Sequence, residues 1–350
     1  MSFAADAGMN ARAGDPVDPA SLLFDAACGA RALPVCDHYA GIESRMTKSL
    51  ALQLELGPVF DVTLDCEDGA PLGGEIEHAH LVAEMAMSSR NSFGRCGARV
   101  HPVTDRSFDT DVSIIVGAAA NRLAYVMLPK VEGVADIDRA AAAIDAAGGA
   151  AIPLHALIET HGGLRAVAAI AAHPRIESLS FGLMDFVSAH RGAIPASAMS
   201  AEGQFAHPLV VRAKLEISAA CHAFGRTPSH SVVTEFGDAS VVAAVARRAA
   251  REFGFTRMWS IHPGQIRPIV GAFAPDPGEI DEALAVLEAA ADAGWAPVRR
   301  GDVLHDRASY RYWWRIAERA RQTGTTLPDA FARRFFGSAC AAAASPAGKA

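Results

Sequence analysis

Two carboxylates follow two consecutive apolar segments of this 350-residue sequence. Glu159 comes directly after the apolar run 152–158, and Asp185 comes shortly after the run 176–181. If the two runs are neighbouring parallel strands, both carboxylates project from the carboxyl edge of one sheet, where α/β proteins bind ligands. Two acids with few cations nearby in the sequence favour a hard divalent ion, so we predict a Mg²⁺ site that would also accept Mn²⁺.

Residues at the ends of other expected strands add to this pair. A guanidinium such as that of Arg99 would hold a substrate carboxylate through two parallel hydrogen bonds. A metal on Glu159 and Asp185 would polarise the oxygen of an α-keto or α-hydroxy acid. Together they predict a site that makes or breaks a C–C bond beside a carbonyl, where enolate charge must be stabilised. The remaining candidates are Glu67, Asp68, Lys130 and His262.

Each candidate also has a structural interpretation. A single carboxylate such as Glu159 is often a helix cap. Glu67 and Asp68 precede Gly-Ala-Pro and fit a turn. Arg99 could form a structural ion pair, and a histidine before a proline, such as His262, is more often structural than catalytic. The cluster is therefore more specific than any member, and it depends on the strand assignment.

Strand-like and helix-like segments alternate along most of the chain. Eight such units between residues 32 and 275 predict a parallel (β/α)₈ TIM barrel, with an α/β open sheet as the alternative. The open sheet is disfavoured because no GxGxxG motif follows the first strand. We predict strands at 32–36, 60–66, 98–103, 123–128, 152–158, 176–181, 229–234 and 257–261.

Composition changes define four expected regions. Residues 1–20 are rich in Ala, Gly, Asp and Pro and are predicted to be disordered, as is the tail 338–350. The barrel is expected over 21–275. Residues 276–337 are expected to form a C-terminal helical lid extension that covers the barrel mouth or a neighbouring subunit.

The overall composition narrows the class of protein. The chain is 51% hydrophobic, which is enough for a sizeable core, and its formal net charge of −7 argues against a nucleic-acid partner. Its six cysteines contain no CxxC spacing, so zinc and disulfide frameworks are not expected. The sequence shows neither a signal peptide nor an apolar run near the roughly 20 residues that span a bilayer. We therefore expect a cytoplasmic enzyme without a membrane partner.

Six ordered motifs resemble the HpcH/HpaI aldolase/citrate lyase superfamily, in the branch of citrate lyase β subunits and malyl-CoA and citramalyl-CoA lyases. The resemblance covers roughly residues 30–325. The motifs are TLDCEDGA (63–70), ARVHP (98–102), VMLPKVEGVADID (126–138), ALIETHGGL (156–164), LSFGLMDF (179–186) and MWSIHPGQIRPIVGAFAP (258–275).

The resemblance implies a TIM barrel and a set of residue roles. Glu159 and Asp185 would ligate Mg²⁺, and Arg99 would bind the carboxylate of a keto-acid fragment. Members of the superfamily are homo-oligomers, here expected as trimers or hexamers, whose C-terminal segment reaches a neighbouring site. Asp306, in LHDRASYRYWW, would be the acid/base at the acyl-CoA carbon. The other roles implied are catalysis by Glu67 and Asp68 and substrate binding by Lys130 and His262.

The reaction implied is the reversible cleavage of a 3-hydroxyacyl-CoA, such as malyl-, citramalyl- or citryl-CoA, into an acyl-CoA and an α-keto acid. One alternative is a class II-type aldolase that acts on a free 4-hydroxy-2-oxo acid without CoA. Another is a barrel that has lost catalysis. Delivery of Asp306 to the mouth would favour the acyl-CoA reaction over the aldolase.

Three features depart from the pattern of the superfamily near the expected substrate. Cys66 and Gly69 replace apolar residues around the Glu-Asp pair, and His101 stands where the third-strand motif commonly has Asn. The segment 188–214 is longer and richer in His and Arg than expected. These departures leave the metal site intact and the identity of the substrate open.

Overall fold

The computed structural model describes residues 19–24 and 32–337. The chain divides into two compact units, which are described separately: a barrel unit, 30–274, and a C-terminal unit, 275–350 together with 1–29. Residues 1–18 and 338–350, most of the first expected disordered segment and all of the second, lie outside the described residues. No helix in the described part of the chain is long and apolar enough to cross a membrane.

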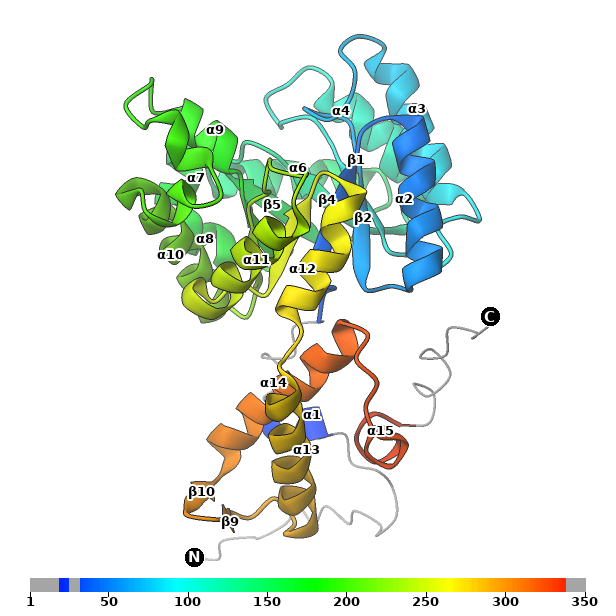
Figure 1. The fold of residues 1–350 in the computed structure, drawn as a ribbon. Helices are drawn as coiled ribbons and strands as arrows, with labels where there is room; N and C mark the ends of the chain where they lie inside the picture. The colour runs from blue at the N-terminus through cyan, green and yellow to red at the C-terminus, as the bar shows by residue number, and fades with distance from the viewer. Residues whose placement is uncertain (1–18, 25–31, 338–350) are drawn as a thin grey trace, which may run out of the picture. The chain divides into compact units, whose positions relative to one another are not determined.

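The barrel unit is a closed ring of eight parallel strands surrounded by helices (Figure 1). β1 pairs in parallel with both β2 and β8, which closes the ring and confirms the predicted TIM barrel. The strands are β1 (Cys36–Ala40), β2 (Phe60–Asp65), β3 (Cys96–Arg99), β4 (Leu123–Leu128), β5 (Leu154–Ile158), β6 (Ile176–Phe181), β7 (Thr227–His230) and β8 (Arg257–Ser260).

The helices of the barrel unit follow the strands in the expected alternation. The α-helices are α2 (Glu43–Leu56), α3 (Glu75–Met87), α4 (Phe108–Asp111), α5 (Gly117–Ala119), α6 (Val134–Ala146), α7 (His161–Arg165), α8 (Val167–Ala172), α9 (Leu183–Ser188), α10 (Pro208–Ala223), α11 (Ala239–Phe253) and α12 (Ile266–Phe273). A π-helix, η2 (Val112–Val116), joins α4 to α5, and the 3₁₀ turns are η3 (Ala196–Met199), η4 (Gly203–Phe205) and η5 (Pro263–Gln265).

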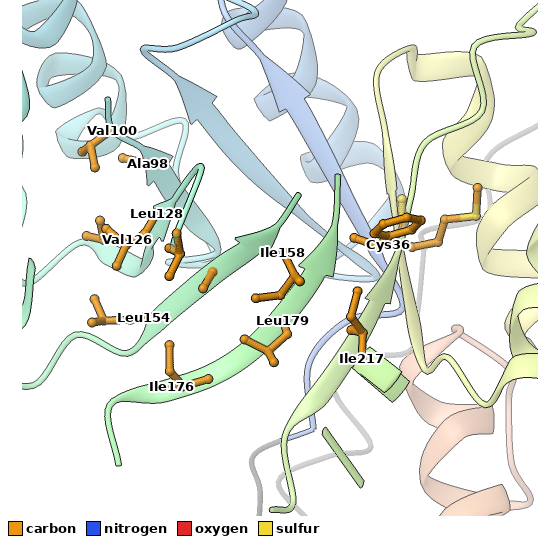
Figure 2. Packing of buried hydrophobic residues seen from close by; sticks show 14 of the residues in the cluster. Cys36, Ala98, Val100, Val126, Leu128, Leu154, Ile158, Ile176, Leu179 and Ile217 are labelled. Carbon is orange, nitrogen blue, oxygen red and sulfur yellow. The ribbon is translucent and has the colours of Figure 1, made fainter. Parts of the chain in front are cut away.

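Two apolar clusters lie on the two faces of the strands. Along β4, Val126 and Leu128 belong to the large cluster between strands and helices, whereas Tyr125 and Met127 belong to a smaller cluster with Trp259. This alternation follows from the two-residue period of a strand. Figure 2 shows side chains of the large cluster on neighbouring strands β4, β5 and β6. The barrel is therefore packed on both faces of its sheet.

Three predicted strands were placed wrongly along the chain. The first was predicted at 32–36 but runs 36–40, because Pro34 precedes it and its polar residues hid it from a search for apolar runs. The third and seventh end earlier than predicted, at Arg99 and His230. Val100 and Val103 lie beyond the end of β3 and still pack in the large cluster. Because these apolar residues are buried although they follow the strand, the predicted strand was too long.

The amino half of the barrel interior holds a buried ionic network. Asp61 accepts hydrogen bonds from Arg95 Nε at 2.6 Å and from Arg257 Nη1 at 2.6 Å. Asp37 accepts from Thr63 Oγ1 at 2.7 Å, and Arg257 Nη2 lies 3.3 Å from the second oxygen of Asp37. The two acids and two arginines balance in charge, which makes burial of each one tolerable.

The C-terminal unit has its own small core. Its elements are α1 (Pro19–Leu23), α13 (Pro277–Asp292), β9 (Val298–Arg300), β10 (Val303–His305), α14 (Arg307–Gln322) and α15 (Asp329–Phe336). Tyr310, Trp314 and Phe331 are buried together there with Leu23. Residues 276–337 contain three of these helices and the hairpin of β9 and β10. Their role as a lid stays a prediction.

The amino-terminal boundary differs from the prediction. Residues 19 and 20 were expected in the disordered segment and 21–23 in the barrel, but all five form α1 of the C-terminal unit. Arg311 Nε donates to Leu23 O at 2.7 Å, which ties α1 to α14. A contact between segments so far apart in the chain leaves no local pattern in the sequence.

Arg257→Met tests the buried ionic network. The variant should lower the free energy of unfolding by about 3–5 kcal/mol, because Asp37 and Asp61 stay buried without their shared guanidinium. Arg267→Met is the matched control, since Arg267 pairs with Glu55 on the surface and both side chains are more than 60% exposed. The control should lose less than about 1 kcal/mol in urea unfolding. Equal losses for the two variants would contradict the prediction.

His38 makes stability depend on pH. Burial lowers the pKa of His38 to about 4, against the opposing effect of Asp37. Between pH 6.5 and 4 the unfolded chain binds a proton at His38 that the folded chain excludes, so stability falls as pH falls through this range. The contribution is at most about 3 kcal/mol. His38→Gln should therefore lose less stability over that range than the wild type, while the exposed control His222→Gln should follow the wild type in urea unfolding.

Candidate active site

The core of the candidate site is an ion pair across two neighbouring strands. Asp65 and Arg99 are the last residues of β2 and β3 and are paired in register. Arg99 donates from Nε and Nη2 to the two oxygens of Asp65 at 2.7 and 2.6 Å. Burial opposes the charge of Arg99, but Asp65 outweighs it and then Glu67 adds to it, so the pKa of Arg99 lies above its ordinary value.

Asp65 was not among the predicted site residues. The signal for it was present in TLDCEDGA, because Asp65 occupies the same strand-end position as the chosen Arg99. Its oxygens also accept hydrogen bonds from the backbone N–H groups of Glu67, at 3.0 Å, and Gly69, at 2.9 Å. One buried carboxylate therefore fixes both the guanidinium and the loop that carries Glu67.

Lys130 links this ion pair to the predicted metal ligands. Glu67 contacts Arg99 Nη1 at 3.0 Å and also pairs with Lys130 Nζ. Lys130 Nζ lies 3.5 Å from Asp68 and 4.0 Å from Asp185. The structure thus brings five of the predicted residues together, with Asp68 at the exposed edge.

Glu159 is the buried member of the predicted metal pair. Its Oε1 accepts a hydrogen bond from the backbone N–H of Lys130 at 2.7 Å. Burial, and then the charge of Asp185, raise the pKa of Glu159 to about 8. Thr160, not Glu159, caps helix α7, because its Oγ1 accepts from Gly163 N. The helix-cap interpretation of Glu159 is therefore wrong.

Backbone conformation keeps this carboxylate in place. Lys130 has a φ of +52°, in the left-handed region that non-glycine residues seldom occupy. Such a conformation costs on the order of 1 kcal/mol and is found where the surroundings impose it. Here it presents the N–H of Lys130 to Glu159. Gly182 lies against the other oxygen, where a Cβ atom would overlap Glu159 Oε2.

The charges and donors at the mouth fit Mg²⁺. Five carboxylates share this region with the two cations Arg99 and Lys130, and the excess of negative charge attracts a cation; they are Asp65, Glu67, Asp68, Glu159 and Asp185. Within 19–24 and 32–337 there is no metal-binding cluster of three or more His, Cys, Asp or Glu residues. Mg²⁺ needs only one or two carboxylates because it keeps several water ligands.

The two other predicted residues make contacts of a different kind. The exposed His262 stacks on Phe236 with ring centroids 5.3 Å apart, and its ring accepts from Gly264 N. Asp306 belongs to the C-terminal unit and caps α14 by accepting from Ala308 N and Ser309 N. A substrate contact for His262 and proton transfer by Asp306 therefore stay predictions.

Gly182→Ala tests how closely Glu159 is held. The added Cβ should displace Glu159 Oε2 and weaken binding of Mg²⁺, or of Mn²⁺ as a spectroscopic probe, by about tenfold or more. Gly237→Ala is the control, since a Cβ there meets no atom within 4 Å. Calorimetric titration with metal measures both variants. Unchanged affinity in a folded Gly182→Ala protein would show that the carboxylate is not a ligand.

Comparison with known proteins places the chain among lyases of related sequence. The L-malyl-CoA/β-methylmalyl-CoA lyase of Cereibacter sphaeroides is 33% identical over 201 residues, 53% of this chain, and the chain spans only 62% of that relative's length. The malyl-CoA/β-methylmalyl-CoA/citramalyl-CoA lyase of Chloroflexus aurantiacus is 30% identical over 288 residues, which cover 75% of this chain and 81% of the relative.

Solved structures show the same fold. A citrate lyase from Burkholderia xenovorans LB400 is 54% identical, with a TM-score of 0.78 over 91% of this chain and all of that one. The CitE protein of Mycobacterium tuberculosis, in complex with magnesium, acetoacetate and coenzyme A, is 22% identical, with a TM-score of 0.64 over 83% of this chain and 99% of that one. The model of the HpcH/HpaI aldolase/citrate lyase family matches residues 61–263, more than half of the sequence. The chain belongs to this family.

Proposed function

We propose that this protein is a Mg²⁺-dependent carbon–carbon lyase that reversibly cleaves a 3-hydroxyacyl-CoA, of the malyl-, citramalyl- or citryl-CoA type, into an acyl-CoA and an α-keto acid. The observation that carries the proposal is the meeting of Glu159 and Asp185 with the Asp65–Arg99 pair at the barrel mouth. The CoA-ester lyases among the relatives support it.

Arg99 would bind the carboxylate of the keto-acid fragment. Asp65 accepts one N–H from Nε and one from Nη2, and Glu67 forms an ion pair with Nη1. A guanidinium has five N–H donors, so donors remain for a substrate carboxylate. Because Asp65 holds the group by two bonds, Arg99 offers these donors in a fixed direction and loses little side-chain entropy on binding.

Glu159 and Asp185 would hold the metal. The hydrogen bond from Lys130 N fixes the orientation of Glu159, as hydrogen bonds to metal ligands commonly do. When bound, Mg²⁺ supplies a Lewis acid that stabilises negative charge on the substrate oxygen. The complex of CitE with magnesium, acetoacetate and coenzyme A supports this choice of ion and of substrate class.

Asp306 would transfer the proton at the acyl-CoA carbon, reaching the site of a neighbouring subunit in a homo-oligomer. Only its Oδ1 takes part in capping α14, and Oδ2 has no hydrogen bond among the described residues. The cap fixes the carboxylate at the start of a helix while leaving one oxygen for chemistry.

Asp185→Ala should abolish cleavage without unfolding the barrel. Loss of a metal that stabilises the transition state by several kcal/mol lowers kcat/KM by more than about 100-fold. The assay compares malyl-, citramalyl- and citryl-CoA with free 4-hydroxy-2-oxo acids, each with Mg²⁺ or with a chelator. Asp109→Ala is the control, because Asp109 pairs with Arg139 on the surface.

Full activity of either wild type or Asp185→Ala in the presence of chelator would refute the metal assignment. Cleavage of the free acids alone would refute the role of CoA and favour the aldolase instead.

A further inference from the structure

A histidine and a buried carboxylate form a pair beside the candidate site. His101 lies two residues beyond Arg99, past the carboxyl end of β3. Its Nδ1 is 2.7 Å from Asp111 Oδ2, and its backbone N–H donates to the same oxygen at 2.9 Å. The side chain of Asp111 is 1% exposed and that of His101 is 17% exposed. The imidazole therefore has one side fixed and the other open to solvent.

The contact with Asp111 decides which nitrogen is available. An ionised carboxylate only accepts hydrogen bonds, so Nδ1 carries the proton and the neutral ring has its lone pair on Nε2. No hydrogen bond to Nε2 is present within 19–24 and 32–337. A buried carboxylate on Nδ1 orients an imidazole and stabilises its cation, which is the arrangement of a general base.

The helix that carries Asp111 gives independent support. Asp111 ends α4 and is followed at once by the π-helix η2. π-helices are rare and occur frequently at functional sites, because the wider turn re-aims the residues beside it. Asp111 Oδ1 is also buried without a hydrogen-bond partner within the described residues, an arrangement that costs stability. The carboxylate of Asp111 therefore lies next to His101 together with two unfavourable features, a π-helix and a buried oxygen without a hydrogen bond.

We propose that His101 is a further proton-transfer residue of the lyase, with Asp111 as its positioning residue. The inference rests on the proposed function. His101 lies on the segment that leaves β3 at its carboxyl end, two residues beyond Arg99, and this end of the strands forms the mouth. The carbon next to the carboxylate held by Arg99 bears the 3-hydroxyl of the substrate. In this proposal His101 would take the hydroxyl proton, whereas Asp306 would serve the acyl-CoA carbon.

Two proton transfers accompany the proposed cleavage. His101 Nε2 takes the proton of the 3-hydroxyl while the C3–O bond becomes the carbonyl of the keto acid. The C2–C3 bond breaks, and its electron pair forms the enolate of the acyl-CoA. The enolate carbon then receives a proton from Asp306. His101 afterwards releases its proton to solvent and Asp306 takes one up from solvent, which restores both residues. Condensation reverses each transfer, so no oxidant or further reactant is needed.

Other charged groups also face His101 and belong to its environment. They are Asp105, on the same loop, and Glu75, at the start of α3; both acids also interact with the guanidinium of Arg106. Asp105 also acts on Asp111.

The test compares His101→Asn, His101→Ala and Asp111→Asn in the full-length enzyme. Asparagine is the residue that the third-strand motif of the family commonly has here, which makes His101→Asn a conservative change. The control is His173→Asn, because His173 pairs with Asp138 at 3.2 Å near the amino end of β6, away from the mouth. The readouts are kcat and KM from pH 5.5 to 9.5, Mg²⁺ affinity, and thermal unfolding.

The expected result is a loss of about 100-fold or more in kcat for all three variants, with KM and Mg²⁺ affinity unchanged. The acidic limb of the pH profile of kcat should disappear in His101→Asn, and added imidazole should restore part of the activity of His101→Ala. A purely structural role would give neither effect. His173→Asn should behave as the wild type.

Two results overturn the inference in distinguishable ways. If the wild type cleaves a CoA ester and folded His101→Asn keeps its kcat and its acidic limb, the inference alone fails. If the wild type cleaves no CoA ester, the proposed function fails and the inference with it. Should His101→Asn not fold, failure of imidazole to rescue folded His101→Ala overturns the inference.

Discussion

The ion pair between Asp65 and Arg99 is the contact on which the barrel mouth depends. It spans the seam between β2 and β3, and the same carboxylate accepts two backbone N–H groups of the loop beyond β2. Arg99 forms an ion pair with Glu67, and Glu67 forms one with Lys130. Lys130 in turn presents its N–H to Glu159. A series of ion pairs and hydrogen bonds thus connects Asp65 to Glu159, the predicted metal ligand. Each contact restricts the movement of the next residue.

A second pair of the same type lies one level lower, between Asp61 of β2 and Arg95, which directly precedes β3. Asp61 and Arg95 precede Asp65 and Arg99 by four residues each, about 13 Å along a strand. The lower pair is buried together with Arg257. The upper pair lies at the ends of its strands, at the mouth. The two pairs therefore differ in their depth in the barrel and not in their residue types.

The sequence was sufficient for the barrel and for most of the cluster at its mouth. Glu159, Asp185 and Lys130 were found because each follows an apolar run, and a parallel sheet brings such positions to one edge. Asp65 was missed because it is the last residue within its strand and was counted as part of the run. β1 was displaced because Asp37 and His38 are polar, and only the closed ring supplies their partners.

Long-range contacts account for the rest. Residues 19–23 join the C-terminal unit through Leu23 and Arg311, and no local periodicity records such a contact. The pair of His101 and Asp111 depends on a π-helix, which the usual helical spacing of side chains does not anticipate. In both cases the sequence specifies the residues, but the geometry arises from packing.

The enclosed ionic network has a consequence for how this barrel can change over evolutionary time. Asp37, Asp61, Arg95 and Arg257 balance one another's charges without any charged group from the loops at the mouth. Substitutions in those loops therefore leave the buried ionic network unchanged. New ligands can be accommodated by exchanging loop residues one at a time, while the network itself can change only by several replacements at once. Single substitutions are therefore tolerated less well in the network at the amino end of the barrel than in the loops at the end where a substrate would bind.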